Sequence, residues 1–281
     1  MSDSPTKRAL LLAGLAGFLV AVVIGITAWS IASRGDGEPS AQATTTVAVP
    51  TSTTTTSPPT TMATTTTAPT TTTTSTTTTT VPPGQEVQII CRDAWGGVPP
   101  TGPFTLHDIE RITVHHTGAL IEDNTLSPGF TRRHQAYHQG TELGWPDIAY
   151  HFLIDSHGYV YEGRRWDAVG DTRTTYDPTG HLLIAVKGNF NEQVITDVQY
   201  ERLVEMLAWG AGTFDIDPAE ITGHRDWAAT ACPGDSLYPL LTDNTIANDV
   251  QALLDEGGAR IVEYCGDDAI QLVADIESGE A

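Results

Sequence analysis

The segment from Gly223 to Asp235 reads GHRDWAATACPGD and places a histidine eight residues before a cysteine. Imidazole nitrogen and thiolate sulfur are ligands that zinc prefers in proteins. The chain contains three cysteines, and an odd number leaves one without a disulfide partner. Cys232 is therefore a buried free thiol, half of a disulfide or a metal ligand, depending on its compartment and on the residues that lie near it.

Two other segments contain residues that could complete a metal site. ITVHHTG ends an expected strand with His115 and His116, and GWPDIAYHF begins another with Tyr150. Neighbouring side chains of a strand point to opposite faces, so only one of these two histidines can share a face with Tyr150. Two histidines and a cysteine, with His224 and Cys232 included, would leave one tetrahedral position open. Catalytic zinc sites have this arrangement and lower the pKa of a bound water toward about 7.

Each of these residues also has a simpler interpretation. A histidine at the end of a strand is more often a hydrogen-bonded residue of the core or the surface. His224 could interact with Asp226, and Cys232 could be a small buried apolar side chain. Spacing alone leaves both interpretations open.

We expect these segments to be held by strands and helices that alternate along the chain. The apolar pattern predicts strands at 87–91, 111–115, 150–155, 159–163 and 182–187. The third and fourth of these form a hairpin with Ser156-His157-Gly158 as its turn. Helices are expected at 131–139, 196–212 and 245–254. This order predicts an α/β fold, in which helices pack on a central sheet.

The N-terminal segment indicates the compartment. Residues 9–29 carry no charge and follow Lys7 and Arg8, and about 20 apolar residues are enough to cross a bilayer. A buried helix and a cleaved signal peptide are the alternatives, but Ala41-Gln42-Ala43 lies too far beyond the apolar stretch for a signal-peptide cleavage site. We expect an uncleaved transmembrane anchor. The positive-inside rule places residues 1–8 in the cytoplasm and the rest of the chain outside.

Residues 30–84 are expected to form a tether. They are rich in threonine and proline, and they offer too little apolar surface to offset the entropy of ordering. Such stretches are typical of O-glycosylated stalks. About forty extended residues could reach on the order of 120 Å. A passive spacer of arbitrary length is an equally good interpretation.

The remaining chain is long enough for one domain. We expect this domain at 85–265, followed by an acidic tail at 266–281 that is either a frayed helix or disordered. The net charge is −21 and the basic residues form no cluster, which argues against nucleic-acid binding because phosphates require grouped lysine and arginine.

Taken together, the motifs resemble the peptidoglycan recognition protein family. That family and the related phage amidase lysozymes include zinc-dependent N-acetylmuramoyl-L-alanine amidases. The resemblance runs in collinear order from about Cys91 to Tyr238. It rests on RDAWG at 92–96, HHT at 115–117, GWPDIAYHF at 144–152, GHRD at 223–226 and CPGD at 232–235. It implies the family's fold, a central mixed sheet flanked by helices.

The resemblance also implies a role for each matched site residue. His115, His224 and Cys232 would bind Zn²⁺, and Tyr150 would donate a hydrogen bond to the oxyanion of the tetrahedral intermediate. Thr230 stands where the phage enzymes carry a catalytic lysine and several amidase-active recognition proteins carry threonine. The implied reaction is hydrolysis of the amide between the lactyl group of muramic acid and L-alanine in peptidoglycan.

Two features bear on activity and on the substrate groove. Non-catalytic members of the family typically lack the cysteine, so Cys232 favours an enzyme over a peptidoglycan-binding receptor, which is the alternative. Asp171-Thr172 follow Val169-Gly170, where many members carry a histidine that lines the groove. Groove contacts therefore stay open. Trp145, Trp166 and Tyr176 are candidates to shape the groove, although we expect Trp145 to pack in the core.

The resemblance leaves Cys91 before the first matched segment and Cys265 after the last expected helix. In an oxidising compartment we expect a disulfide between them, joining the two ends of the domain and contributing about 4–5 kcal/mol; two free thiols are the alternative. The expected protein is a monomer, anchored in the membrane by a single span, whose extracytoplasmic domain faces the peptidoglycan.

Overall fold

The computed structural model describes residues 84–281. The expected transmembrane anchor at 9–29 and nearly all of the expected tether lie outside this range. Within residues 84–281, no helix has both the length and the apolar character needed to cross a membrane.

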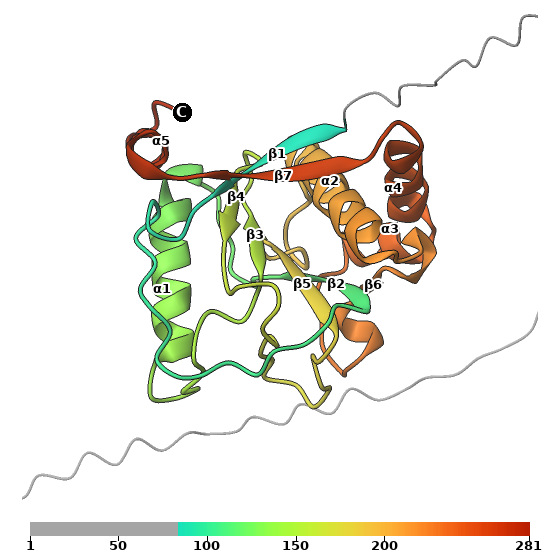
Figure 1. The fold of residues 1–281 in the computed structure, drawn as a ribbon, viewed down its shortest axis with the longest axis horizontal. Coiled ribbons are helices and arrows are strands. Elements are labelled where there is room, and N and C mark those ends of the chain that lie inside the picture. The colour runs from blue at the N-terminus through green and yellow to red at the C-terminus, as the bar shows by residue number, and fades with distance from the viewer. Residues whose placement is uncertain (1–83) are drawn as a thin grey trace, which may run out of the picture. The chain divides into compact units, whose positions relative to one another are not determined.

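The centre of the domain is a mixed seven-stranded sheet with strand order β6-β2-β5-β3-β4-β1-β7 (Figure 1). Among the seven named strands of residues 84–281, only β3 and β4 pair antiparallel, and they form the expected hairpin. The strands are β1 (Gln85–Ile90), β2 (Arg111–His116), β3 (Phe152–Ile154), β4 (Val160–Glu162), β5 (His181–Val186), β6 (Thr222–Gly223) and β7 (Ala259–Tyr264). The predicted α/β class, with a mixed sheet and flanking helices, is confirmed.

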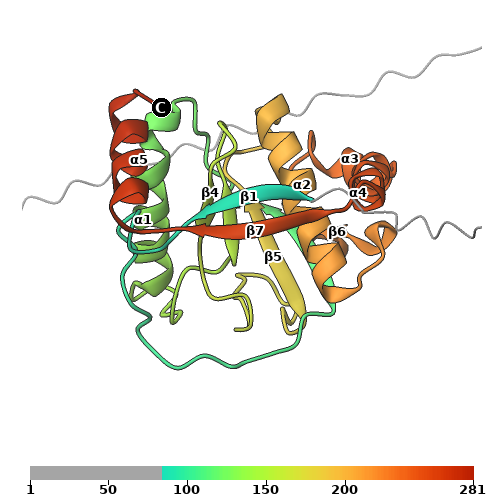
Figure 2. The same ribbon diagram turned by 45° about the horizontal axis from the view of Figure 1, so that its top comes forward.

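Helices cover both faces of the sheet (Figures 1 and 2). Ile89 packs in the apolar cluster that includes α2, whereas its neighbour Ile90 packs in the cluster that includes α5, as strand alternation requires. The helices are α1 (Ser127–Gln139), α2 (Asp197–Phe214), α3 (Tyr238–Thr242), α4 (Thr245–Asp255) and α5 (Gly266–Ser278), with short 3-10 turns η1 (Asn124–Leu126), η2 (Pro218–Glu220) and η3 (His224–Asp226).

Local sequence explains where helices α1 and α2 begin. Thr196 caps α2 by accepting a hydrogen bond from the backbone N–H of Gln199. Helix α1 begins at Ser127, four residues before the expected start. The reason is Pro128, which lies in the first turn, where its fixed φ suits a helix and its missing N–H costs nothing.

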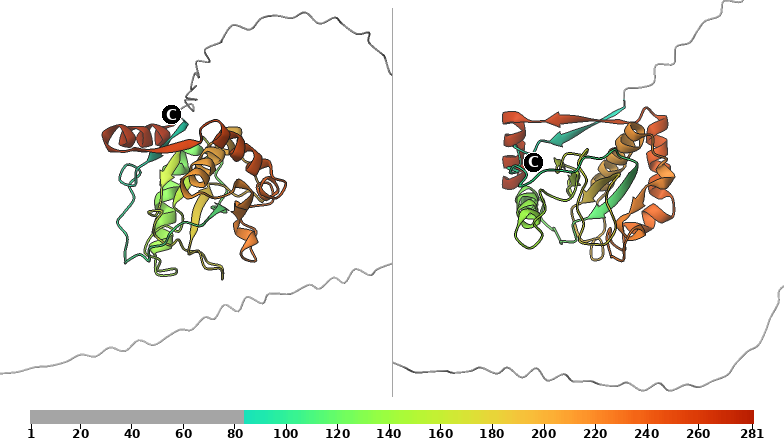
Figure 3. Two further views of the ribbon diagram at one scale, coloured as in Figure 1. Left: turned by 45° about the vertical axis from the view of Figure 1, so that its right-hand side comes forward. Right: turned by 60° about the horizontal axis from the view of Figure 1, so that its bottom comes forward.

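The C-terminal segment is part of the folded domain, contrary to the expectation of a frayed or disordered acidic tail. β7 pairs in parallel with β1 along its full length, and α5 packs against α1 (Figure 3). Ala269, Val273 and Ile276 recur at helical spacing and are buried, while the acidic residues occupy the exposed face. Cys91 and Cys265 form the predicted disulfide, with 5.1 Å between their Cα atoms. The bridge joins the end of β1 to the start of α5.

Candidate active site

Strand β2 supplies the first histidine of the site. His115 is 1% exposed and points toward the face covered by α1, whereas His116 points to the other face. There the backbone N–H of Phe190 donates to Nδ1 of His116 at 3.3 Å. The prediction that only one of the two histidines shares a face with Tyr150 is therefore confirmed: the ring centres of His115 and Tyr150 are 5.2 Å apart.

His224 and Cys232 reach the same place from one loop. β6 pairs with β2 through Val114 and Gly223, so His224, the next residue, lies beside His115. The loop then returns toward the end of β2 before Gly234. A Cβ atom at Gly234 would lie 2.5 Å from Phe190. The backbone φ angle of Gly234 is 106°, a conformation that residues with a side chain rarely adopt. Glycine therefore permits the close approach that seats the Cys232 loop.

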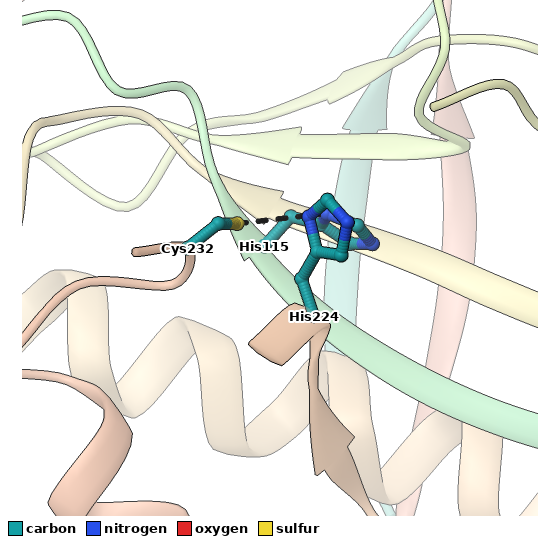
Figure 4. A group of neighbouring side chains, drawn as sticks. All are labelled: His115, His224 and Cys232. Atoms are coloured by element: carbon teal, nitrogen blue, oxygen red, sulfur yellow. Dashed lines mark hydrogen bonds between the residues drawn. The ribbon is translucent and has the colours of Figure 1, made fainter. Parts of the chain in front are cut away.

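The three side chains form a compact group of metal-ligand atoms (Figure 4). The potential ligand atoms of His115, His224 and Cys232 all lie within 4.8 Å of one another, and all three residues are buried. Sγ of Cys232 is 3.7 Å from Nδ1 of His115. Two imidazoles and a thiol at this separation fit the donor set of a catalytic zinc site.

Burial controls the protonation of these ligands. It lowers the pKa of His115 well below its ordinary value, with a further contribution from His224, and it lowers the pKa of His224 to about 4. Both imidazoles are thus neutral near pH 7, the form that binds metals. Burial raises the pKa of Cys232 to about 12, while the backbone N–H of His116 donates to its sulfur at 3.3 Å. A cation bound beside this sulfur would favour the thiolate.

Tyr150 and Thr230 occupy different positions around this group. Burial raises the pKa of the Tyr150 phenol above its usual range, with smaller contributions from Cys232 and Tyr176, so the phenol stays protonated as a donor. Oγ1 of Thr230 accepts a hydrogen bond from the backbone N–H of Cys232 at 3.2 Å. Thr230 therefore shapes the loop that carries the sulfur, as well as lining the cavity in front of it.

This cavity has a volume of about 310 Å³ and is open to solvent on one side. All five residues expected at the site line it, together with residues from the loop after β2, from α1, from the segment before β3 and from the loop before β5. These are His116, Thr117, Gly118, His134, Tyr137, His138, Trp145, Ala149, Asp171, Thr172, Arg173 and Thr174.

The three aromatic candidates for the groove lie in different places. Trp145 lines the cavity and packs on His138 with ring centres 4.8 Å apart, so the expectation that it packs in the core is wrong. The reason is that Trp145 lies between α1 and β3, in a segment that is not part of the sheet. Trp166 packs on Phe214 and borders a different cavity. Tyr176 lies against His224, with ring centres 5.2 Å apart.

Sequence reasoning names Tyr176 only as a groove candidate and does not single out Thr174, so it misses the contacts of their hydroxyl groups with the two histidines. Thr174 Oγ1 lies 2.8 Å from Nε2 of His224, and the Tyr176 hydroxyl lies 3.4 Å from Nε2 of His115. Both come from the irregular loop before β5, which has no periodic pattern to place them. Their contacts depend on the conformation of that loop.

Comparisons with known proteins identify the family of the chain. The sequence profile of a family described as N-acetylmuramoyl-L-alanine amidase matches residues 105–235, which include all five expected site residues. Peptidoglycan recognition protein 1 of Mus musculus is 34% identical over 157 residues, covering 54% of this chain and 85% of that protein. The N-acetylmuramoyl-L-alanine amidase of Homo sapiens is 36% identical over 159 residues, but this stretch is only 27% of the human protein.

Solved structures give the same result. The Drosophila peptidoglycan recognition protein SD matches with a TM-score of 0.51 and 29% identity, covering 56% of this chain and 94% of that one. The complex of peptidoglycan recognition proteins LCa and LCx with tracheal cytotoxin matches with the same TM-score and identity, and 95% of the matched chain is covered. This chain therefore belongs to the peptidoglycan recognition protein and type 2 amidase family. Proteins of this family that carry the amidase name and proteins named for recognition both lie among its relatives.

Proposed function

We propose that the protein is a zinc-dependent N-acetylmuramoyl-L-alanine amidase, which hydrolyses the amide between the lactyl group of muramic acid and L-alanine of peptidoglycan. The convergence of His115, His224 and Cys232 at the floor of an open cavity is the observation that carries this proposal. Family membership supplies the substrate class, and the donor set supplies the chemistry.

The chain's own residues would perform distinct parts of the reaction. Zinc bound by the three donors would polarise the amide carbonyl and lower the pKa of water toward about 7. Tyr150 would donate a hydrogen bond to the oxygen that becomes negative in the transition state, and one such preorganised donor contributes about 3 kcal/mol. Its raised pKa keeps that proton in place. Thr230 would hold the Cys232 loop so that the sulfur faces the two imidazoles.

A peptidoglycan-binding receptor that performs no hydrolysis is the second candidate. It is favoured by the relatives named for recognition and by the structure of two of them with tracheal cytotoxin. The complete donor set argues for the enzyme, because a receptor has no need for a buried thiol beside two neutral imidazoles.

We also propose that the domain works outside the cytoplasm as a monomer, anchored by residues 9–29 and tethered by residues 30–84. The disulfide between Cys91 and Cys265 supports this location, because such bonds persist in oxidising compartments. The tether would allow the domain to reach peptidoglycan at a distance from the membrane.

The variant Cys232→Ser separates the two candidate functions. We expect hydrolysis of peptidoglycan to fall below detection, because one of three metal donors is lost, while sedimentation with insoluble peptidoglycan remains close to that of the unmodified chain. Undiminished hydrolysis by Cys232→Ser would rule out the zinc assignment. Loss of sedimentation together with hydrolysis would show that the substitution affects folding or binding as a whole.

A further inference from the structure

The loop between the cavity and β5 places three hydroxyl groups against the two histidines of the metal-ligand group. Thr172, Thr174 and Tyr176 alternate along this loop and turn toward the site, whereas Thr175, between them, is exposed. The five site residues that the family resemblance implies do not include them.

Thr174 makes the shorter contact. Its Oγ1 lies 2.8 Å from Nε2 of His224, and Thr172 Oγ1 lies 3.4 Å from the same nitrogen. The two threonines also hold each other in position. Their hydroxyls are 2.8 Å apart, and the backbone N–H of Thr174 donates to Oγ1 of Thr172 at 3.1 Å. The Thr174 hydroxyl can therefore accept a hydrogen bond from the imidazole N–H while donating one to Oγ1 of Thr172.

Tyr176 makes the equivalent contact to the other histidine. Its hydroxyl lies 3.4 Å from Nε2 of His115, whose Nδ1 is the nitrogen 3.7 Å from the sulfur of Cys232. The ring of Tyr176 is held between His224 and His181, with centre-to-centre distances of 5.2 and 5.3 Å. The hydroxyl is thus positioned by the packing of its ring.

Each of these hydroxyls can accept a hydrogen bond from Nε2–H, which is the contact that the imidazole needs when Nδ1 binds a metal. When the hydroxyl accepts from Nε2–H, the lone pair is left on Nδ1 and is free to bind a metal. A hydrogen bond to the nitrogen that does not bind metal fixes the orientation of the ring and raises its basicity as a ligand. For His115 the nitrogen left free in this way is the one that faces Cys232.

We propose that Thr174 and Tyr176 are positioning residues that hold His224 and His115 in the Nδ1-binding form and thereby raise the affinity of the site for zinc. This inference rests on the proposed function in one respect, that the three donors bind zinc. It adds Thr174 and Tyr176 to the three donors as residues that support the site. Both come from the loop before β5, to which the family resemblance assigned no role.

The test is a measurement of zinc affinity in the full-length chain, by competition with a chromophoric chelator at fixed pH. Thr174→Val keeps the shape of the side chain and removes the hydroxyl, so we expect it to weaken zinc binding by about 10–100-fold. Thr175→Val is the matched control, because that side chain is exposed and has no hydrogen bond among the described residues. Thr174→Ser restores the hydroxyl and should recover most of the affinity.

Cobalt gives a second readout that does not depend on catalysis. Co²⁺ bound to a tetrahedral site with one thiolate has visible absorption bands that report the ligand geometry. We expect these bands to shift in Thr174→Val and in Tyr176→Phe, and to stay unchanged in Thr175→Val. Tyr176→Phe retains the ring, so it tests the hydroxyl even if a substitution at position 174 prevents folding.

The outcomes separate this inference from the proposed function. If the unmodified chain binds one zinc and Thr174→Val, Tyr176→Phe and Thr175→Val all bind it equally, the positioning role is wrong and the zinc site stands. If the unmodified chain binds no zinc, both proposals are wrong. Weaker binding in Thr174→Val with recovery in Thr174→Ser supports the inference.

Discussion

At the scale of single residues, the site depends on where protons reside. Burial keeps His115 and His224 neutral, keeps the Cys232 thiol protonated until a cation is near, and keeps the Tyr150 phenol protonated. The imidazoles and the phenol are therefore in the forms that their proposed parts in the reaction require, whereas the thiol would lose its proton on binding zinc. A site of the same residues on an open surface would have no such control.

Replacing Tyr150 with phenylalanine tests the oxyanion donor. The ring that packs beside His115 is retained and only the hydroxyl is lost, so zinc content should be unchanged. We expect kcat to fall by about 100–1,000-fold, the loss typical of one oxyanion donor, with a much smaller change in KM. A kcat within a few-fold of the unmodified protein would mean that another group stabilises the oxyanion.

Lys187 provides a test of the electrostatics of the core. It is 1% exposed, its Nζ lies 2.9 Å from Oγ of Ser127 and 3.2 Å from the ring centre of Tyr161, and Asp155 and His134 are the other titratable groups nearby. Burial lowers the pKa of this lysine to about 7, and the carboxylate of Asp155 opposes that shift.

The lowered pKa predicts how stability changes with pH. Between about pH 7 and pH 10.5 the unfolded chain holds the Lys187 proton more tightly than the folded chain, so stability should rise with pH in that window. Relative to Lys187→Met, which lacks the titration, the free energy of unfolding should increase by about 2 kcal/mol from pH 7 to pH 9. Urea unfolding of both proteins at the two pH values measures it. Parallel pH profiles would show that the lysine is not desolvated in the way described.

At the scale of elements, the site is assembled by strand neighbours and by loops that return to them. β6 lies beside β2, so His224 meets His115, and the following loop brings Cys232 back to the end of β2. The strands and the alternation of His115 and His116 were predictable because a buried strand has a repeating pattern. The contacts of Thr174 and Tyr176 were not, because an irregular loop has no repeat from which side-chain direction follows.

A different reason explains why β7 was not predicted and why α5 was expected only as a frayed helix or a disordered tail. β7 lies at the edge of the sheet and carries Arg260 and Glu263, so its apolar pattern is weak. The acidic residues of α5 dominated the composition of the last segment, although Ala269, Val273 and Ile276 mark its buried face. Composition alone is thus a poor guide where an amphipathic helix carries its charge on one side.

The disulfide fixes these elements to the rest of the domain and gives a stability prediction. Cys91 and Cys265 are 174 residues apart, so the bond constrains a long loop of the unfolded chain. Replacing both with alanine should lower the free energy of unfolding by about 4–5 kcal/mol, as measured by urea denaturation. Dithiothreitol should destabilise the unmodified protein and leave the double variant unchanged. Equal stability of the two proteins would indicate that β7 and α5 hold their place without the bond.

At the scale of the whole molecule, the net charge and the order of segments along the chain are consistent with the proposed cell-wall enzyme. The net charge of −21 without a basic cluster argues against nucleic acid as a partner, and the apolar N-terminal stretch precedes a long threonine-rich segment and then the folded domain. We propose that the threonine-rich segment acts as a tether, which lets the cavity of the folded domain reach peptidoglycan at a distance from the membrane. The family and the fold class could be predicted from the motifs, whereas the way the C-terminal segment completes the sheet required the structure.

The most direct test of the central claim is mass spectrometry of the products that the full-length chain releases from purified peptidoglycan, with and without a zinc chelator. We expect free stem peptides with an N-terminal alanine, absent when the chelator is present and restored when zinc is added back. Binding of the chain to peptidoglycan without release of stem peptides, although zinc is bound, would contradict the account and identify the protein as a receptor.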